Sequence, residues 1–308
     1  MKNNLLILAL IIPIISLTCG CAPPDAGQVV GYVNLEDLKP LTVPTQEVAP
    51  LRVAVASIVS PKGTIQSYEP LLKYLEKQFN RPVELIQRRT YMETNDLIAA
   101  GQVDLAFVCT SAYVAGHDDF GMQLLVAPQV NGKTVYQSFL IVPFDSPAQS
   151  IADLKGKVFA FTDPISLSGR MYPTYLVQQL GYNPDKFFGQ TFFIYNHDEA
   201  IRAVANKLAD GAGVDSMVYD YAVSRDPTLT TKIRVIYRSP DFGIPPVVVS
   251  PKLDANLKRQ LQKVLLNMNN TVDGRTALES IGVEKFTTID DHDYDNIRSL
   301  LSDINNTY

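Results

Sequence analysis

The order of strand-like and helix-like segments constrains the fold of this chain more than any other feature. Short apolar runs alternate with amphipathic helical segments over residues 51–127, and a second series of the same kind covers residues 157–237. The segment from Tyr68 to Phe79, for example, carries its large apolar side chains on one helical face. Alternating strands and helices indicate an α/β fold with largely parallel sheets. The pattern predicts two α/β lobes, with a single large α/β enzyme as the alternative.

Two extended segments connect the two series. The first runs from Tyr136 to Pro147 and the second from Ser239 to Pro246, and the helices after Leu253 complete the first lobe. We therefore expect a two-stranded hinge, with residues 51–145 and 240–308 in lobe 1 and residues 146–239 in lobe 2. A hinged pair of lobes closes on a ligand that lies in the cleft between them.

The first residues indicate export. Lys2 precedes an apolar run over residues 5–17, and small residues follow up to Cys21. A basic start, an apolar run of this length and a small-residue cleavage point are typical of a secretory signal peptide, here residues 1–20. The run is too short to span a bilayer. Cys21 directly after a glycine predicts lipid attachment at that residue, with Cys19 as a second candidate and plain secretion as the alternative.

Residues 21–50 are rich in proline and show no sustained hydrophobic period. That composition predicts a partly extended tether that holds a folded body away from the membrane. An ordered arm packed on the body is the alternative, because residues 29–33 contain a short strand-like run. We expect the mature protein to be exported and lipid-anchored, in the periplasm or on the outer face of the cell membrane.

Composition and motif content argue against several classes of function. The formal net charge is −5, so the chain offers no general basic surface for nucleic acid. Cys109 is the one cysteine of the body, which leaves no internal disulfide and predicts a buried free thiol. The three histidines lack metal-ligand spacing, and the common hydrolase, nucleotide-binding and zinc-protease motifs are absent. We therefore expect a monomeric binding protein without catalysis, cofactor or metal.

The strongest local signal is the segment Asp163-Pro-Ile-Ser-Leu-Ser-Gly169, which follows a strand and opens a helix. A helix N-terminus presents unpaired N–H groups and a positive dipole end. Ser166 and Ser168 add hydroxyl donors, and Gly169 would let the backbone approach a ligand closely. The segment predicts a cradle for an oxyanion, and plain capping of the helix by serine is the alternative.

Further polar residues occupy positions from which they would reach the same cleft. Hydroxyl or imidazole groups stand at two other junctions between a strand and a helix, one acid ends an apolar strand, and three tyrosines would wall a small pocket. These residues are Thr110, Ser111, His197, Asp215, Tyr68, Tyr113 and Tyr136. Capping, solvated strand ends and ordinary packing are the alternatives for each of them.

Several stretches together resemble one known family. They read Asp-Leu-Lys-Gly-Lys at 153–157, the segment at 163–169, His-Asp at 197–198, Gly-Val-Asp-Ser at 213–216 and Gly-Ile-Pro-Pro-Val at 243–247. In this order and spacing, the chain from residue 51 to about residue 304 resembles the periplasmic phosphate/phosphite/phosphonate-binding proteins of ABC importers. The resemblance implies a two-lobed type II periplasmic-binding-protein fold with a two-stranded hinge.

The resemblance also implies roles for residues. The Ser-x-Ser-Gly loop at Ser166, Ser168 and Gly169 would hold the oxyanion together with His197, with the tyrosines and Asp215 around it. Two departures affect the identity of the ligand. Leu167 stands where many family members have a hydroxyl residue, and Cys109-Thr110 replaces a frequent Gly-Pro pair.

The function that follows is capture of a small phosphorus oxyanion (phosphonate, phosphite or phosphate) for an ABC permease in the cytoplasmic membrane. The alternative is a ligand-sensing domain that signals to a membrane partner such as a histidine kinase, and an enzyme that acts on a phosphorus ester is a third. We further expect a small, uncharged substituent on phosphorus rather than an aminoalkyl chain. A buried ammonium needs carboxylate partners, and Asp215 is the one nearby acid that the sequence identifies.

Overall fold

A computed structural model describes residues 48–306 of the chain. The expected signal peptide, the lipid site at Cys21 and the tether lie outside the described residues. The described residues carry two large sheets of six and five strands and a third sheet of two short strands. In this part of the chain, no helix combines the length and the apolar character that a membrane crossing requires.

Lobe 1 is built on the six-stranded sheet, in which the strand order is β13-β4-β12-β3-β1-β2. Strands β1, β2 and β3 run parallel, whereas β12 and β13 return antiparallel to their neighbours. The strands are β1 (Leu51–Val55), β2 (Val83–Ile86), β3 (Leu105–Phe107), β4 (Gln123–Gln129), β12 (Val247–Val249) and β13 (Lys285–Thr287). The helices are α1 (Pro61–Phe79), α2 (Tyr91–Ala100), α3 (Thr110–Phe120), α8 (Ala255–Leu266), α9 (Val272–Ser280) and α10 (Asp295–Asn306).

Lobe 2 is built on the five-stranded sheet, in which the strand order is β10-β6-β9-β7-β8. Strands β7, β8 and β9 run parallel, and β6 is antiparallel to β9 and β10. The strands are β6 (Ser138–Pro143), β7 (Val158–Phe161), β8 (Gln190–Phe193), β9 (Gly211–Asp215) and β10 (Ile233–Arg238). The helices are α4 (Tyr172–Gln179), α5 (Pro184–Phe187), α6 (His197–Ala205) and α7 (Ser216–Arg225), and a π-helical turn covers Leu167–Met171.

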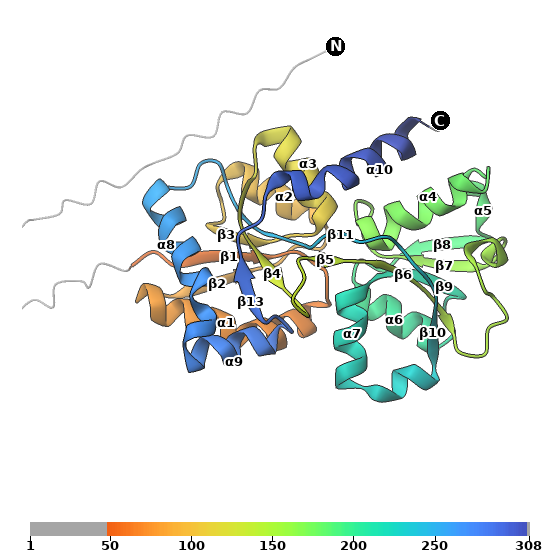
Figure 1. The fold of residues 1–308 in the computed structure, drawn as a ribbon, viewed down its shortest axis with the longest axis horizontal. Coiled ribbons are helices and arrows are strands. Elements are labelled where there is room, and N and C mark those ends of the chain that lie inside the picture. Colours follow the sequence, from red (N-terminus) through yellow and green to blue (C-terminus); the bar gives the residue numbers. More distant parts are fainter. Residues whose placement is uncertain (1–47, 307–308) are drawn as a thin grey trace, which may run out of the picture. The chain divides into compact units, whose positions relative to one another are not determined.

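Both large sheets are covered by helices on their two faces, as Figure 1 shows. In lobe 1, Val53 and Val55 pack with α1, α8 and α9, while Ala54 and Ala106 pack with α2, α3 and α10. In lobe 2, Ile141 packs with α6 and α7 on one face, and the opposite face packs with α4 and α5. Strands that are buried on both faces carry near-continuous apolar sequences, which is why the sequence pattern identified these strands.

The two lobes are connected by the pair of short strands β5 (Val135–Tyr136) and β11 (Phe242–Gly243), in which Phe242 lies opposite Tyr136. This pair is the expected two-stranded connection between the lobes, and its action as a hinge stays a prediction. The predicted boundary at residue 145 was wrong, because β6 pairs along its length with β9 and β10 and so belongs to lobe 2. The first crossing therefore ends near Gln137, and half of the segment from Tyr136 to Pro147 is strand β6.

Helix α1 begins earlier than the sequence pattern predicted. It starts at Pro61 rather than Tyr68, and the Ser60 hydroxyl accepts a hydrogen bond from the Gly63 amide at 3.4 Å. Serine followed by proline is a common helix start. Residues 61–67 carry one large apolar side chain, that of Ile65, which is exposed, so the apolar period of the helix begins only near Tyr68.

Candidate functional site

Hydrogen bonds join the two lobes along the edge where the predicted site residues lie. The Ser60 amide and hydroxyl donate to the Asp198 carboxylate at 2.8 and 2.6 Å. The Tyr91 amide donates to the Asp163 carboxylate at 2.9 Å, and the Ser111 hydroxyl donates to the Ile165 carbonyl. Because these bonds cross from lobe 1 to lobe 2, the structure represents a closed arrangement in which polar side chains lie buried between the lobes.

The loop after β7 forms one side of this buried region. The Ser166 hydroxyl accepts the Gly169 amide at 3.1 Å and lies 3.5 Å from Nε2 of His197. The Ser138 hydroxyl donates to the Ser168 carbonyl at 2.8 Å, which anchors the loop to the first residue of β6. Ser166 therefore caps the π-helical turn, as the capping alternative required, while Ser168 presents a hydroxyl that the turn does not use.

His197 is a neutral donor in a fixed orientation. Its Nδ1 accepts the Asp215 amide at 3.1 Å, and burial lowers the pKa of the imidazole to about 3. A neutral imidazole carries one proton, and the bond at Nδ1 assigns that proton to Nε2. The Nε2–H group faces the Ser166 hydroxyl and offers an uncharged hydrogen bond to an anion.

Unpartnered hydroxyls identify the centre of the buried region. The side-chain oxygens of Thr162, Ser168, Tyr91 and Tyr136 are buried without a hydrogen-bond partner among the described residues. Buried polar groups are nearly always hydrogen-bonded in native proteins. Four such hydroxyls on facing elements therefore indicate a place for a polar ligand that accepts hydrogen bonds.

Electrostatic contacts link three of these hydroxyls, those of Tyr136, Ser168 and Tyr91. Burial raises the pKa of Tyr136 well above its usual value; Cys109 and Asp215 add to this rise, and the hydroxyls of Thr110 and Ser168 oppose it. These two hydroxyls are thus close to the Tyr136 oxygen without meeting hydrogen-bond geometry. Burial likewise raises the pKa of Tyr91, with contributions from Asp163 and Tyr136. Both tyrosines therefore stay protonated and can donate.

Asp215 is the acidic member of the site. It caps α7 by accepting the Met217 and Val218 amides at 2.7 and 3.2 Å. Burial raises the pKa of its carboxyl to about 7, against the two amide bonds that lower it. Near neutral pH this carboxyl can hold a proton or accept one from a partly protonated oxyanion.

We refer to Tyr91, Thr162, Ser168, His197 and Asp215, with Ser166 and Tyr136, as the anion cluster. A cavity of about 510 Å³ adjoins it and is lined by residues of both lobes and of the hinge. Tyr68, Tyr136 and Asp215 line this cavity. Tyr136 and Asp215 thus belong to both regions.

The remaining predicted residues serve the framework. A Cβ atom at Gly169 would lie 1.7 Å from Oγ1 of Thr162, so the glycine is required by packing and not by approach to a ligand. The Thr110 hydroxyl donates to the Gly243 carbonyl at 2.8 Å and joins α3 to the hinge. The Ser111 hydroxyl is engaged across the lobes with Ile165.

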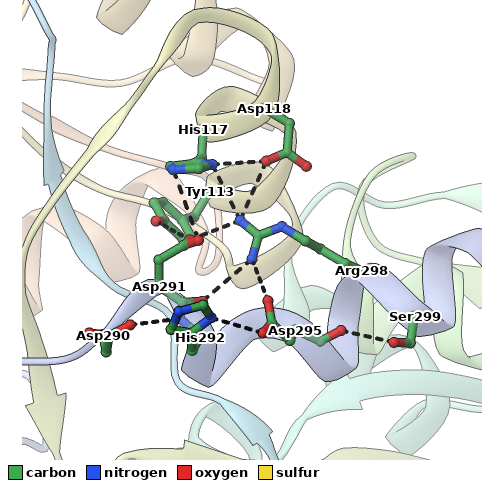
Figure 2. A network of polar contacts seen from close by, with 9 residues as sticks. All are labelled: Tyr113, His117, Asp118, Asp290, Asp291, His292, Asp295, Arg298 and Ser299. Carbon is green, nitrogen blue, oxygen red and sulfur yellow. Dashed lines mark hydrogen bonds and ion pairs between the residues drawn. The ribbon is translucent and has the colours of Figure 1, made fainter.

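Tyr113 lies in a different part of lobe 1. Its hydroxyl donates to Asp291 at 2.6 Å, and Asp291 also accepts from Arg298 at 2.8 Å. Figure 2 shows these residues with His117 and Asp118 in one polar network between α3 and α10. The structure therefore does not bring Tyr113 to the anion cluster.

Two residues of the cluster escaped the sequence analysis. Tyr91 is the first residue of α2, and Thr162 follows β7 directly before the predicted cradle. The capping box formed by Thr90 and Glu93 identifies the start of α2 from sequence. That start lies in lobe 1 and meets the cradle of lobe 2 through the bond from the Tyr91 amide to Asp163, a contact that the sequence does not reveal.

Comparison with known proteins places the chain in a family. Residues 53–294 match the family described as "ABC transporter, phosphonate, periplasmic substrate-binding protein". The chain is 31% identical over 208 residues to the phosphate-import protein PhnD of Mycolicibacterium smegmatis, a match that covers 63% of this chain and 65% of the relative, just under two thirds of its length.

Two further comparisons agree with this family match. The chain is 26% identical over 268 residues to the phosphonates-binding periplasmic protein of Escherichia coli, covering 85% of this chain and 79% of that protein. A crystal structure of a binding-protein component of an ABC phosphonate transporter from Pseudomonas aeruginosa superposes with a TM-score of 0.79 at 24% identity, covering 84% and 88% of the two chains. The chain has the type II periplasmic-binding-protein fold and belongs to the family of periplasmic substrate-binding proteins of phosphonate ABC transporters.

Proposed function

We propose that the chain captures a small phosphorus oxyanion (phosphonate, phosphite or phosphate) in the anion cluster and delivers it to an ABC permease. The observation that supports this most strongly is the set of four buried, unpartnered hydroxyls at Thr162, Ser168, Tyr91 and Tyr136. The Nε2–H group of His197 adds a donor whose direction is set by Asp215. The family match supports both the ligand class and the transport role.

Uncharged donors suit the capture of an anion that must later be released. Hydrogen bonds to a charged group contribute about 1.5–3 kcal/mol each, and several of them acting together give tight binding without a buried counter-charge. Asp215 adds selectivity, because its carboxyl accepts a proton from a partly protonated phosphorus oxyanion, and sulfate carries no such proton near neutral pH. The donors act by binding and orienting the anion, and we assign no catalytic step to them.

The proposal extends to the setting of the protein. We propose that it acts as a monomer on the outer face of the cell membrane or in the periplasm, attached through lipid on Cys21. The proline-rich residues 22–50 would then separate the lobes from the membrane.

A ligand screen tests the proposed function. Thermal shift and calorimetry with phosphite, methylphosphonate, phosphate, 2-aminoethylphosphonate and sulfate should show stabilisation by phosphorus oxyanions and none by sulfate, since ligands that bind only the folded state raise the melting temperature. Sulfate as the tightest ligand, or no stabilisation by any phosphorus compound, would contradict the proposal.

A further inference from the structure

The cavity borders the anion cluster at two residues. Tyr136 and Asp215 line the cavity, and the Tyr136 hydroxyl is also close to Ser168 and Thr110 at the cluster. We infer that a substituent on a phosphorus atom bound in the cluster would enter the cavity on the side of Tyr136 and Asp215. The inference that follows rests on the proposed function and concerns what this substituent is.

The inner wall of the cavity is apolar. Buried aliphatic, aromatic and proline side chains from both lobes face it, among them Val55, Phe107, Pro128, Phe139, Val218 and Phe286. Of the charged residues that line the cavity, Asp215 is buried beside the cluster, whereas Lys133, Asp220 and Asp241 are exposed and so lie toward solvent. Moving inward from solvent, the cavity thus passes from charged to apolar and ends at the polar cluster.

The volume of the cavity exceeds what a small substituent needs. At about 510 Å³ it lies within the range of pockets that enclose drug-sized ligands, which is roughly 300–1,000 Å³. A hydrogen or methyl group on phosphorus would leave the apolar side chains without contacts. The expectation of a small substituent, drawn from the sequence, does not agree with this geometry.

An aminoalkyl chain fits the geometry less well than an apolar one. An ammonium two carbons from phosphorus would lie among the inner apolar side chains, where an unpaired charge is costly. Asp220 and Asp241 are exposed at the mouth, and Oδ1 of Asp215 already accepts two backbone amides. An ammonium among the inner side chains would therefore have Asp215 as the one buried acid of the cavity lining, and the same carboxyl is the group proposed to accept a proton from the oxyanion.

We propose that the preferred ligand is a phosphorus oxyanion that carries an unbranched apolar chain of several carbons, with the oxyanion in the anion cluster and the chain in the cavity. An alkylphosphonate and an alkyl phosphate monoester share this chemistry. Selectivity then has two parts: hydrogen bonds recognise the head group, and burial of the chain sets how tightly each homologue binds.

A homologous series tests the proposal. Calorimetry with methyl-, propyl- and hexylphosphonate should show affinity that rises with chain length. Burial of one methylene is worth about a fourfold change in affinity, so hexylphosphonate should bind at least about a hundredfold more tightly than methylphosphonate. Hexyl phosphate serves as the second source of the same chemistry, and its affinity relative to hexylphosphonate shows which head group the cluster prefers.

Variants that fill the cavity sharpen the test. Val130→Phe and Val283→Phe each enlarge a partly buried residue that lines the cavity. Each should weaken hexylphosphonate binding by about tenfold or more, while methylphosphonate binding stays unchanged. Val272→Phe is the matched control, because Val272 is 70% exposed on α9 and is not part of the cavity lining. Two independent variants protect the test against one that fails to fold.

The outcomes separate this inference from the proposed function. Equal affinities across the series, or tightest binding of 2-aminoethylphosphonate, would overturn the apolar-chain proposal while phosphorus oxyanions still bind. Failure of every phosphorus compound to bind would overturn the proposed function and this inference with it. Affinity that rises with chain length and falls selectively in the two filled variants would support the proposal.

Discussion

Ser166 and Ser168 stand two residues apart in one loop, yet their hydroxyls have different tasks. The Ser166 hydroxyl accepts the Gly169 amide and holds the turn, whereas the Ser168 hydroxyl is buried without a partner. A capping hydroxyl contributes to folding, while an unpartnered buried hydroxyl opposes it until a ligand accepts its proton. The two serines are therefore a matched pair for separating stability from binding.

Ser168→Ala should weaken binding of methylphosphonate by about ten- to a hundredfold, the loss expected for one hydrogen bond to a charged group. Its melting temperature without ligand should stay level or rise, because a costly buried hydroxyl is removed. Ser166→Ala should instead lower the free energy of unfolding by about 0.5–2 kcal/mol. Calorimetry and thermal melts of both variants check this, and equal behaviour of the two serines would refute the distinction.

The raised pKa of the Asp215 carboxyl predicts that the stability of the protein depends on pH. Its folded-state pKa of about 7 lies above the ordinary value of 3.8. The stability contributed by the protonated carboxyl is therefore fully present below pH 3.8 and is lost as pH rises through 7. Asp215→Asn keeps a cap for α7 and cannot ionise, so its unfolding free energy relative to wild type should increase between pH 4 and pH 8, by at most about 4 kcal/mol.

The contribution of His197 to stability changes with pH in the opposite direction, because its folded-state pKa of about 3 lies below the ordinary value of 6.5. Its contribution is present above pH 6.5 and is lost as pH falls toward 3. Wild type and Asp215→Asn both carry His197. The difference between their unfolding free energies therefore reports the contribution of Asp215. Chemical denaturation of both proteins between pH 4 and pH 8 measures this difference. A difference that does not change with pH would show that burial does not raise the pKa of the Asp215 carboxyl.

Residue-level signals explain what the sequence could and could not predict about the site. The loop at residues 163–169 was recognisable because small polar residues follow an apolar strand. Tyr91 was not, because an aromatic at a helix start gives no local sign that its hydroxyl will be buried without a partner. Tyr113 was misplaced, since its partner Asp291 lies 178 positions away in the sequence and only tertiary packing decides where its hydroxyl points.

At the scale of elements, the strands and helices were predictable because buried parallel strands and amphipathic helices leave clear periodic patterns. The membership of β6 was not predictable in the same way. Its six residues, Ser138–Pro143, read as one extended segment with the hinge strand before them, and only pairing with β9 and β10 assigns them to lobe 2. Such pairing depends on contacts distant in sequence.

The start of α1 and the start of α6 form a contact between the lobes. Asp198 in the first turn of α6 accepts from the amide and hydroxyl of Ser60, the capping residue of α1. Neither residue lines the cavity or belongs to the anion cluster. The contact is therefore positioned to favour closure of the lobes without touching the ligand.

Asp198→Ala should lower the affinity for methylphosphonate by about tenfold, because the closed form becomes less populated and apparent affinity scales with that population. Glu199→Ala is the matched control: Glu199 is the next acid on α6 and pairs with Arg202 of the same helix. Stopped-flow measurements should assign the loss in Asp198→Ala to faster ligand release. Unchanged kinetics would show that the Ser60–Asp198 contact does not stabilise the closed form.

At the scale of the whole molecule, the proposed lipid site predicts where the lobes operate. Cys21→Ser should release the protein from the membrane fraction, because the acceptor of the expected lipid is removed while the signal peptide is retained. Cys19→Ser is the control and should leave the protein with the membrane. Fractionation followed by immunoblotting measures both. Release by Cys19→Ser in place of Cys21→Ser would move the lipid site to Cys19.

Ligand binding and closure of the two lobes are expected to be coupled. In the closed arrangement, four hydroxyls are buried without partners, and each such group costs about 1–3 kcal/mol. Under the proposed function, a phosphorus oxyanion would accept hydrogen bonds from them and remove that cost, so the ligand should shift the population toward closure around the β5–β11 hinge. Small-angle scattering should therefore give a smaller radius of gyration with methylphosphonate than without it, and Ser168→Ala should need more ligand to reach the same value. Identical curves with and without bound ligand would mean that the lobes do not move, and the hinge would then be a connection only.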